Sequence, residues 1–239
     1  MRSEKEKLVG EPRHDFASLR LLTEVLRSPE GCPWDREQDH KSIRNDLIEE
    51  CYEVVEAIDT EDPVLLREEL GDVLFQVLFH ARIEEEKGSF TIDDVIHDIC
   101  AKMIHRHPHV FGDVRADTSE KVLANWEVIK KEEKSRKSAK ESMTAIPPML
   151  PALMRAQKVA GKAMKDGYDF GTEEALWNEI HAIGPGKDRE ETLAALAKLT
   201  ELSAILTKKL DGDLEGQVQK DTSEFIKNYQ NPKLEEHHE

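Results

Sequence analysis

Apolar residues recur along most of the chain at intervals of three and four, which is the spacing of one face of a helix. Seven of them follow this spacing in one segment: Ile43, Leu47, Ile48, Cys51, Val54, Val55 and Ile58. The same spacing predicts further helices over 16–27, 63–87, 91–107, 119–137, 152–166, 173–183, 190–210 and 214–229. Since no segment shows the sustained alternation of a strand, we expect an all-α fold built as a helical bundle.

Residues that favour helix ends stand beside these segments. Four of them can cap a helix N-terminus: Asp15, Ser42, Asp62 and Thr91. Pro63 suits a first helical position, and Gly88 suits the end of a helix. The two prolines and one glycine of 28–35 predict a loop.

A polar, proline-containing stretch separates two helical regions. Residues 137–151 end in Ile-Pro-Pro-Met-Leu-Pro and are interpreted as a linker. The sequence therefore predicts a first helical domain over 1–136 and a second one over 152–239.

The charge balance narrows the class of protein. The chain has 34 Lys and Arg against 50 Asp and Glu, a formal charge of −16, which opposes attraction of the whole surface to nucleic acid. No apolar run approaches the roughly 20 residues of a membrane span, and the first eleven residues lack a secretory signal. Three cysteines with no close pair favour reduced thiols, so we expect a cytoplasmic protein that binds neither membrane nor nucleic acid.

Two groups of carboxylates occupy consecutive predicted helices. Glu49, Glu50 and Glu53 lie on the first, and Glu69 and Asp72 lie on the second. Residues three apart share one side of a helix, and a short connection makes such helices antiparallel neighbours. At about 100° per residue, Glu50 and Glu69 fall at the margins of the apolar faces. They therefore point toward the contact between the helices, although solvated acidic faces are the ordinary alternative.

Carboxylates gathered at a helix contact repel one another unless a proton, a basic partner or a cation relieves the repulsion. Oxygen ligands without cysteine or histidine favour a hard ion, Mg²⁺ or Mn²⁺. Because Mg²⁺ held by few carboxylates recruits substrate phosphates, this pattern points to phosphate chemistry.

Basic and aromatic residues downstream could meet such a substrate. Lys102 and Arg106 are four apart on one predicted helix, and Trp126 and Lys130 are four apart on another. Lysine offers a point charge to phosphate and arginine a bidentate fork. Trp126 could stack on a base or pack in the core, and Trp34 has the same two interpretations.

Two other patterns are weaker. The sequence His105-Arg-His-Pro-His109 resembles a zinc site but has no cysteine partner, and its proline interrupts helical pairing. A phosphate-facing Arg106 at a helix end fits better. Cys32 could be a nucleophile, but no activating histidine is evident, so we assign it to packing in the loop.

The acidic pattern and its flanks together resemble one family. Glu49-Glu-x-x-Glu53 followed by Glu69-x-x-Asp72 resembles the signature of the MazG nucleoside triphosphate pyrophosphohydrolases. Three flanking segments match as well, in the same order: Gly31-Cys-Pro-Trp-Asp35, Arg106-His-Pro-His-Val-Phe-Gly-Asp113 and Asn125-Trp-Glu-x-Ile-Lys130. The resemblance covers about residues 15–134.

The resemblance implies an all-α, Mg²⁺-dependent hydrolase of nucleoside triphosphates that releases a monophosphate and pyrophosphate. It implies a homodimer or a higher assembly. It makes Glu50, Glu53, Glu69 and Asp72 the metal ligands, with Glu49 orienting water or binding a further ion. It also assigns nucleotide binding to Lys102, Arg106, Trp126 and Lys130.

The second half departs from this pattern. Leu150–Gln157 and Gly167–Phe170 resemble the start of a second MazG domain. A loose alignment on Gly212 and Asp213 then sets Ala195-Leu-Ala-Lys198 against Glu69-Leu-Gly-Asp72, and lysine there would repel Mg²⁺. We expect a degenerate repeat without a metal site, and an unrelated helical tail is the alternative.

Other functions stay open at this point. A dUTPase-like or phosphoribosyl-ATP-hydrolysing relative of the same superfamily would carry similar acids. A nucleotide-binding regulator that senses triphosphates with little turnover is an alternative of another class. The intact acids of the first half argue against it, and the eroded second half argues for some regulatory component. A purely structural helical protein would have no reason to place Glu50 and Glu69 at a helix contact.

Overall fold

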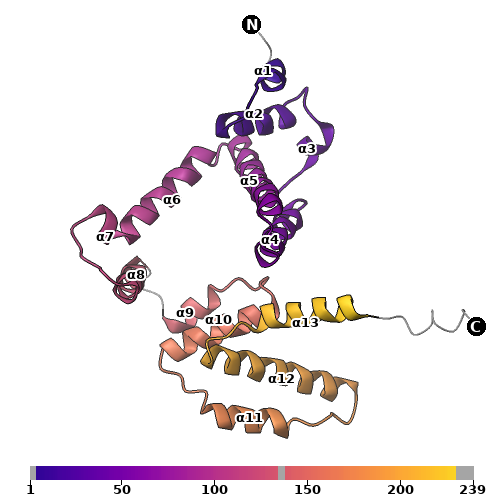
Figure 1. Cartoon of the computed structure of the whole chain (residues 1–239), viewed down its shortest axis with the longest axis vertical. Helices are drawn as coiled ribbons and strands as arrows, with labels where there is room; N and C mark the ends of the chain where they lie inside the picture. The colour runs from indigo at the N-terminus through magenta and orange to yellow at the C-terminus, as the bar shows by residue number, and fades with distance from the viewer. Residues whose placement is uncertain (1–3, 134–137, 230–239) are drawn as a thin grey trace, which may run out of the picture. The chain divides into compact units, whose positions relative to one another are not determined.

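The computed structural model describes residues 4–133 and 138–229, with backbone alone for 127, 130–133 and 139. Throughout these ranges its regular elements are helices, as Figure 1 shows, which confirms the all-α prediction. The chain divides between residues 130 and 131 into two compact units, and each is described by itself.

The first unit contains the helices that were expected to carry the site. Their bounds are α1 (Glu4–Gly10), α2 (Phe16–Arg27), α3 (Pro33–Glu37), α4 (Arg44–Asp59), α5 (Pro63–Glu86), α6 (Ile92–Arg106), α7 (Pro108–Phe111) and α8 (Ser119–Glu133). The end of α8 was expected at 137, and residues 134–137 lie outside the described residues.

Three of the four expected caps are present. The carboxylate of Asp15 accepts the Ser18 N–H at 2.9 Å, that of Asp62 accepts two N–H groups, and Thr91 forms a capping box with Asp94. The Ser42 prediction is wrong, because α4 begins after Ile43 and the Ser42 hydroxyl donates to the Asp39 carbonyl instead. The loop expected over 28–35 is correct only to residue 32, because α3 begins at Pro33, where proline suits a first helical turn.

Helices α4 and α5 form an antiparallel hairpin closed by a tight turn. The Asp62 N–H donates to the Ala57 carbonyl at 3.0 Å and the Glu61 N–H donates to the Ile58 carbonyl at 3.1 Å. This is the Schellman pattern, with Glu61 in the left-handed region at φ 54°. The turn sends the chain directly back along α4, and this brings the two acidic segments together.

Helix α2 packs against the C-terminal half of α5 and holds it through apolar and ionic contacts. Leu78, Ala81 and Ile92 form a buried cluster against which Leu19 packs. Arg27, whose side chain is 6% exposed, donates two hydrogen bonds to Glu86 at 2.8 and 3.0 Å. It also donates to the carbonyls of Asp35 and Gln38, so one guanidinium ties α2 and α5 to the segment around α3.

The second unit has its own core. Its helices are α9 (Ala139–Thr144), α10 (Ala152–Lys165), α11 (Glu173–Ala182), α12 (Arg189–Lys209) and α13 (Leu214–Asn228). The buried cluster contains five residues: Ala160, Leu176, Leu202, Ile205 and Leu206. Since α10, α11 and α12 each contribute to it, the unit is a helical body and not a set of loose segments.

The segment 137–151, expected to be a linker, contains a helix and a buried residue. Within 137–151, Ser138 and Glu141 form a capping box that starts α9, and Ile146 is buried. Lys162 of α10 also donates to the Ser142 carbonyl. This segment therefore packs on α10 as part of the second unit.

None of the helices in the described ranges combines the length and hydropathy needed to cross a membrane.

A candidate metal-binding active site

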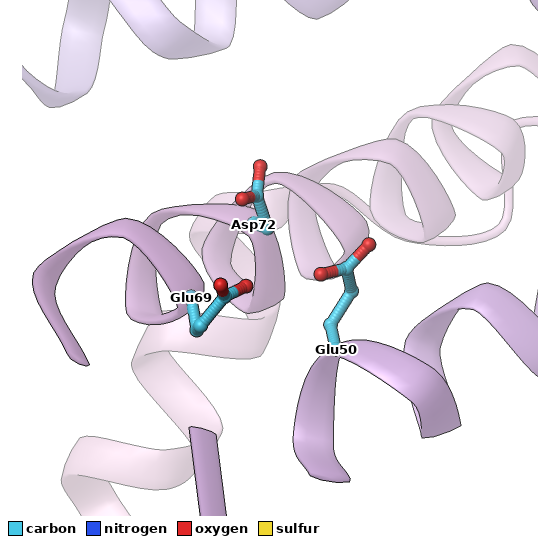
Figure 2. A group of neighbouring side chains, drawn as sticks. All are labelled: Glu50, Glu69 and Asp72. Carbon is cyan, nitrogen blue, oxygen red and sulfur yellow. The ribbon is translucent and has the colours of Figure 1, made fainter. Parts of the chain in front are cut away.

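Three carboxylates converge between α4 and α5. Glu50 projects from α4, and Glu69 and Asp72 project from successive turns of α5 (Figure 2). One oxygen of each lies within 4.8 Å of one oxygen of each of the others. The spacing of three residues on α5 puts both of its acids on the side that faces α4, as expected from the sequence.

Burial distinguishes these acids from an ordinary charged surface. Glu69 is 8% exposed, and Glu50 is half-buried, whereas Asp72 is exposed. The site is therefore anchored between the helices at one end and open to solvent at the other. Burying a carboxylate is costly unless a positive partner balances its charge, so a buried Glu69 suits a site that binds a cation.

Two further acids of α4, Glu53 and Glu49, lie outside the triad formed by Glu50, Glu69 and Asp72. Glu53, one turn after Glu50, hydrogen-bonds both Glu50 and Glu69, which requires a shared proton when no cation is bound. It thus lies beside the triad rather than among its mutually close oxygens. Glu49 is exposed on α4.

The electrostatics follow from this crowding. Burial, the hydrogen bond from Glu53 and the charge of Asp72 raise the pKa of Glu50 to about 7. Burial, followed by the charges of Glu53 and Glu68, raises the pKa of Glu69. Like charges at short distance favour the neutral form of one partner. A divalent cation would reverse this balance, because it stabilises the charged forms.

A histidine pair fixes the chain just before α4, and the sequence analysis missed it. Nδ1 of His40 lies 2.8 Å from Nδ1 of His80 on α5, and Nε2 of His40 lies 2.6 Å from a Glu84 oxygen. Burial and the neighbouring His40 lower the pKa of His80. The i, i+4 spacing of His80 and Glu84 was the one available signal, and it named no partner 40 residues away.

The predicted nucleotide-binding residues lie on α6 and α8. Lys102 is exposed and Arg106 is half-buried on α6. The Arg106 guanidinium carbon lies 5.9 Å from the ring centroid of Trp126, so the structure brings these two together. The side chain of Lys130 lies outside the described residues.

Trp34 and Cys32 lie at the start of α3. Trp34 is 60% exposed, which excludes the core-packing interpretation within this chain. Cys32 is half-buried as the residue preceding α3, in agreement with a packing role. In the described part of the chain, the residues gathered closely enough to hold a metal ion are carboxylates alone, so the histidines at 105–109 form no such group.

Comparison with known proteins adds an independent line of evidence. The model of the MazG nucleotide pyrophosphohydrolase domain matches residues 38–111, a range that includes all five acids. The chain is also 40% identical over 225 residues to the nucleoside triphosphate pyrophosphohydrolase/pyrophosphatase MazG of Thermotoga maritima, covering 92% of this chain and 86% of that protein. This chain belongs to the MazG family.

Two further relatives match about two thirds of the chain. A nucleoside triphosphate pyrophosphohydrolase of Escherichia coli is 49% identical over 156 residues, which are 64% of this chain and 59% of that protein. The protein YabN of Bacillus subtilis is 53% identical over 146 residues, 61% of this chain and 30% of its own length. The MazG resemblance inferred from the motifs is therefore confirmed, and the family is one of hydrolases acting on phosphoric anhydrides.

Proposed function

We propose that this protein hydrolyses nucleoside triphosphates at the α-phosphate, releasing the monophosphate and pyrophosphate in an Mg²⁺-dependent reaction. Convergence of Glu50, Glu69 and Asp72 is the observation that carries this proposal. The names of the Thermotoga maritima and Escherichia coli relatives support the substrate class. Removal of such triphosphates from the nucleotide pool would be the resulting cellular role.

The donor set fits a magnesium ion, and Mn²⁺ is the second choice. Mg²⁺ binds oxygens at about 2.1 Å, so two of its ligands lie about 3–4 Å apart. The carboxylate oxygens within 4.8 Å of one another need only small side-chain rotations to reach such distances. We assign Glu50, Glu69 and Asp72 as ligands, with Glu53 joining them once it gives up the proton that it shares.

Bound Mg²⁺ supplies charge neutralisation for the triphosphate and a lowered pKa for a coordinated water. The protein's own residues then orient the reactants. Glu49, the exposed residue before Glu50 on α4, accepts a hydrogen bond from the attacking water. Lys102, Arg106 and Lys130 hold the phosphate oxygens and the charge of the leaving pyrophosphate. The exposed ring of Trp34 and the half-buried ring of Trp126 are available for contacts with the base.

Separate replacement of the triad tests the proposal. Glu69→Gln and Asp72→Asn keep the size of each side chain and remove one ligand charge, so turnover should fall at least 100-fold. Glu56→Gln is the matched control, because Glu56 is an exposed glutamate on the same hairpin. The assay separates products from the eight common ribo- and deoxyribonucleoside triphosphates, with Mg²⁺ and with chelator.

The outcome decides between the two functions considered above. Monophosphate and pyrophosphate that appear only with Mg²⁺, and that are lost in the two triad variants, would support the hydrolase. Tight binding of triphosphates without turnover in the wild type would favour a sensor. Full turnover in folded Glu69→Gln protein would contradict the assignment of the site.

We further propose that residues 152–239 form a degenerate MazG-like domain that acts as a scaffold. The loose alignment sets Lys198 of α12 against Asp72, and Lys198 pairs with Glu201 at 3.0 Å. Counted back from the ends of α5 and α12, Ala195 takes that place instead, and neither residue is a carboxylate. Both α5 and α12 end in a Schellman closure, around Gly88 and Asp211, before a capped helix begins. The repeated order of helix, closure and cap supports a common origin over an unrelated tail.

A homodimer completes the proposal. Large apolar side chains stay exposed along the hairpin and α6: Tyr52, Val55, Ile58, Leu70, Leu74, Val77, Ile96 and Ile99. Spacings of three and four place Leu70, Leu74 and Val77 on one face of α5. Extended apolar surface of this kind is typical of an interface between subunits.

A further inference from the structure

Aromatic side chains gather where α6 passes into α7, and they meet α8. His107 is the residue between α6 and α7. Its ring lies 5.0 Å from the ring of Trp126, centroid to centroid, at an interplanar angle of 83°. The guanidinium of Arg106 lies over the same indole. Trp126 is thus held by two consecutive residues of the α6 terminus.

The orientation of the His107 ring is itself fixed. Its Nδ1 lies 2.6 Å from the Met103 carbonyl, which belongs to the last turn of α6. An Nδ1–H that donates to this oxygen holds the ring against the last turn of α6. Because Pro108 follows, the backbone of His107 is also restricted, with φ −120° and ψ 55°.

A perpendicular contact between two rings specifies geometry more strongly than apolar burial does. The positive edge of one ring meets the negative face or rim of the other, and such pairs contribute about 0.5–1.5 kcal/mol beyond burial, a factor of roughly 2–12 in an equilibrium constant. In α8 this contact restricts the indole of Trp126, which is only half-buried.

We propose that His107 is a positioning residue for base recognition: it sets the plane of the Trp126 indole on which the nucleobase stacks. The inference rests on the proposed function, in which Trp126 contacts the base. His107 itself touches no substrate, and its effect on the nucleotide passes through the tryptophan. Neither a zinc site nor packing of the loop is needed to explain this histidine.

Steady-state kinetics with two His107 variants test the inference. His107→Asn keeps a donor for the Met103 carbonyl but removes the ring, so KM for a nucleoside triphosphate should rise about 2- to 12-fold, with kcat unchanged within about twofold. His107→Phe keeps the ring edge and should leave KM near the wild-type value. The inhibition constant of inorganic tripolyphosphate, which has no base, should not move in either variant.

Further variants test the base-contacting role of Trp126 separately from the positioning role of His107. Trp126→Ala should raise KM by about 5- to 150-fold, since base stacking contributes roughly 1–3 kcal/mol. Adding His107→Asn to Trp126→Ala should then produce no further rise. His105→Asn is the matched control, an exposed histidine two residues earlier. His107→Gln replaces the asparagine variant if that protein does not fold.

Three results would overturn the inference. Equal KM values for the Asn and Phe variants would show that the ring contact does not by itself set KM. If KM rises in Trp126→Ala but not in His107→Asn, His107 has no positioning role and the proposed function is unaffected. An unchanged KM in Trp126→Ala would remove the base-contacting role of Trp126 and the inference with it.

Discussion

At the scale of single residues, environment gives the acids of this chain their different properties. Hydrogen bonds from Lys87 and then His40 lower the pKa of Glu84, on α5, to about 2. Burial, a hydrogen bond from Glu53 and the charges of neighbouring acids raise the pKa of Glu50 to about 7. Two glutamates of one hairpin thus differ because one accepts hydrogen bonds from basic groups and the other is half-buried among carboxylates.

The raised pKa of Glu50 predicts how metal binding depends on pH. A cation must displace the proton of Glu50, so apparent Mg²⁺ affinity should rise about tenfold per pH unit below pH 7 and level off above it. Isothermal titration calorimetry in buffers of different ionisation enthalpy would measure the affinity and the released proton. An affinity that stays constant between pH 5.5 and 7 would contradict this prediction.

Stability without metal should show the opposite trend. The folded state holds the Glu50 proton at pH values where the unfolded chain, with a pKa near 4.5, has lost it. Folding stability therefore falls as pH rises from about 4.5 to 7. In chelator, Glu50→Gln should gain stability over the wild type as pH rises through this range, and equal pH profiles of the melting temperature would refute the assignment.

At the scale of elements, the α4–α5 hairpin determines the site. Its turn spans only Thr60 to Asp62, so the two helices must pack side by side. The closure uses a left-handed residue, yet the sequence has glutamate there and not glycine. A side chain in that region costs about 1–2 kcal/mol, which the packing of the hairpin offsets.

The strained turn predicts a stabilising substitution. Glu61→Gly removes the Cβ at φ 54°, and after the larger entropy loss of glycine a net gain of about 0.5–1 kcal/mol remains. The melting temperature should rise by about 1–4 °C. Thr60→Gly is the matched control at φ −86° and should lower it. A melting temperature that falls in Glu61→Gly would show that the glutamate side chain has a structural role.

At the scale of the whole molecule, large apolar side chains of the first unit stay exposed although their helical spacing predicts burial. Val55 on α4 is 49% exposed and Leu74 on α5 is 39% exposed, although both belong to the apolar periodicity of their helices. Periodicity of this strength predicts burial. Contact with a second copy would supply that burial.

Charges placed on this face should therefore separate the subunits. The double variant Val55→Glu/Leu74→Glu adds two negative charges, and light scattering after gel filtration should show one chain where the wild type shows at least two. Lys41→Glu changes the charge by the same amount at an exposed position before α4 and should keep the wild-type mass. A wild-type protein of single-chain mass would contradict the proposed dimer.

The sequence by itself determined the helices and most of their ends. The apolar spacing and the residues Asp15, Asp62, Gly88 and Thr91 act within one or two turns, so local pattern is enough to place α2, α5 and α6. It failed at Ser42, where a neighbouring turn competed for the same hydroxyl. Ser42 bonds the Asp39 turn instead of capping α4.

The candidate site, like the fold, was predicted from the sequence only in part. Helical spacing and the short connection already placed Glu50, Glu69 and Asp72 on facing sides, since those relations follow from helix geometry. Only the tertiary structure decided that Glu69 is buried, that Glu53 bonds its neighbours and that His107 meets Trp126 nearly 20 residues away. Burial and side-chain contact depend on what the rest of the fold brings to each position, and no local pattern contains that information.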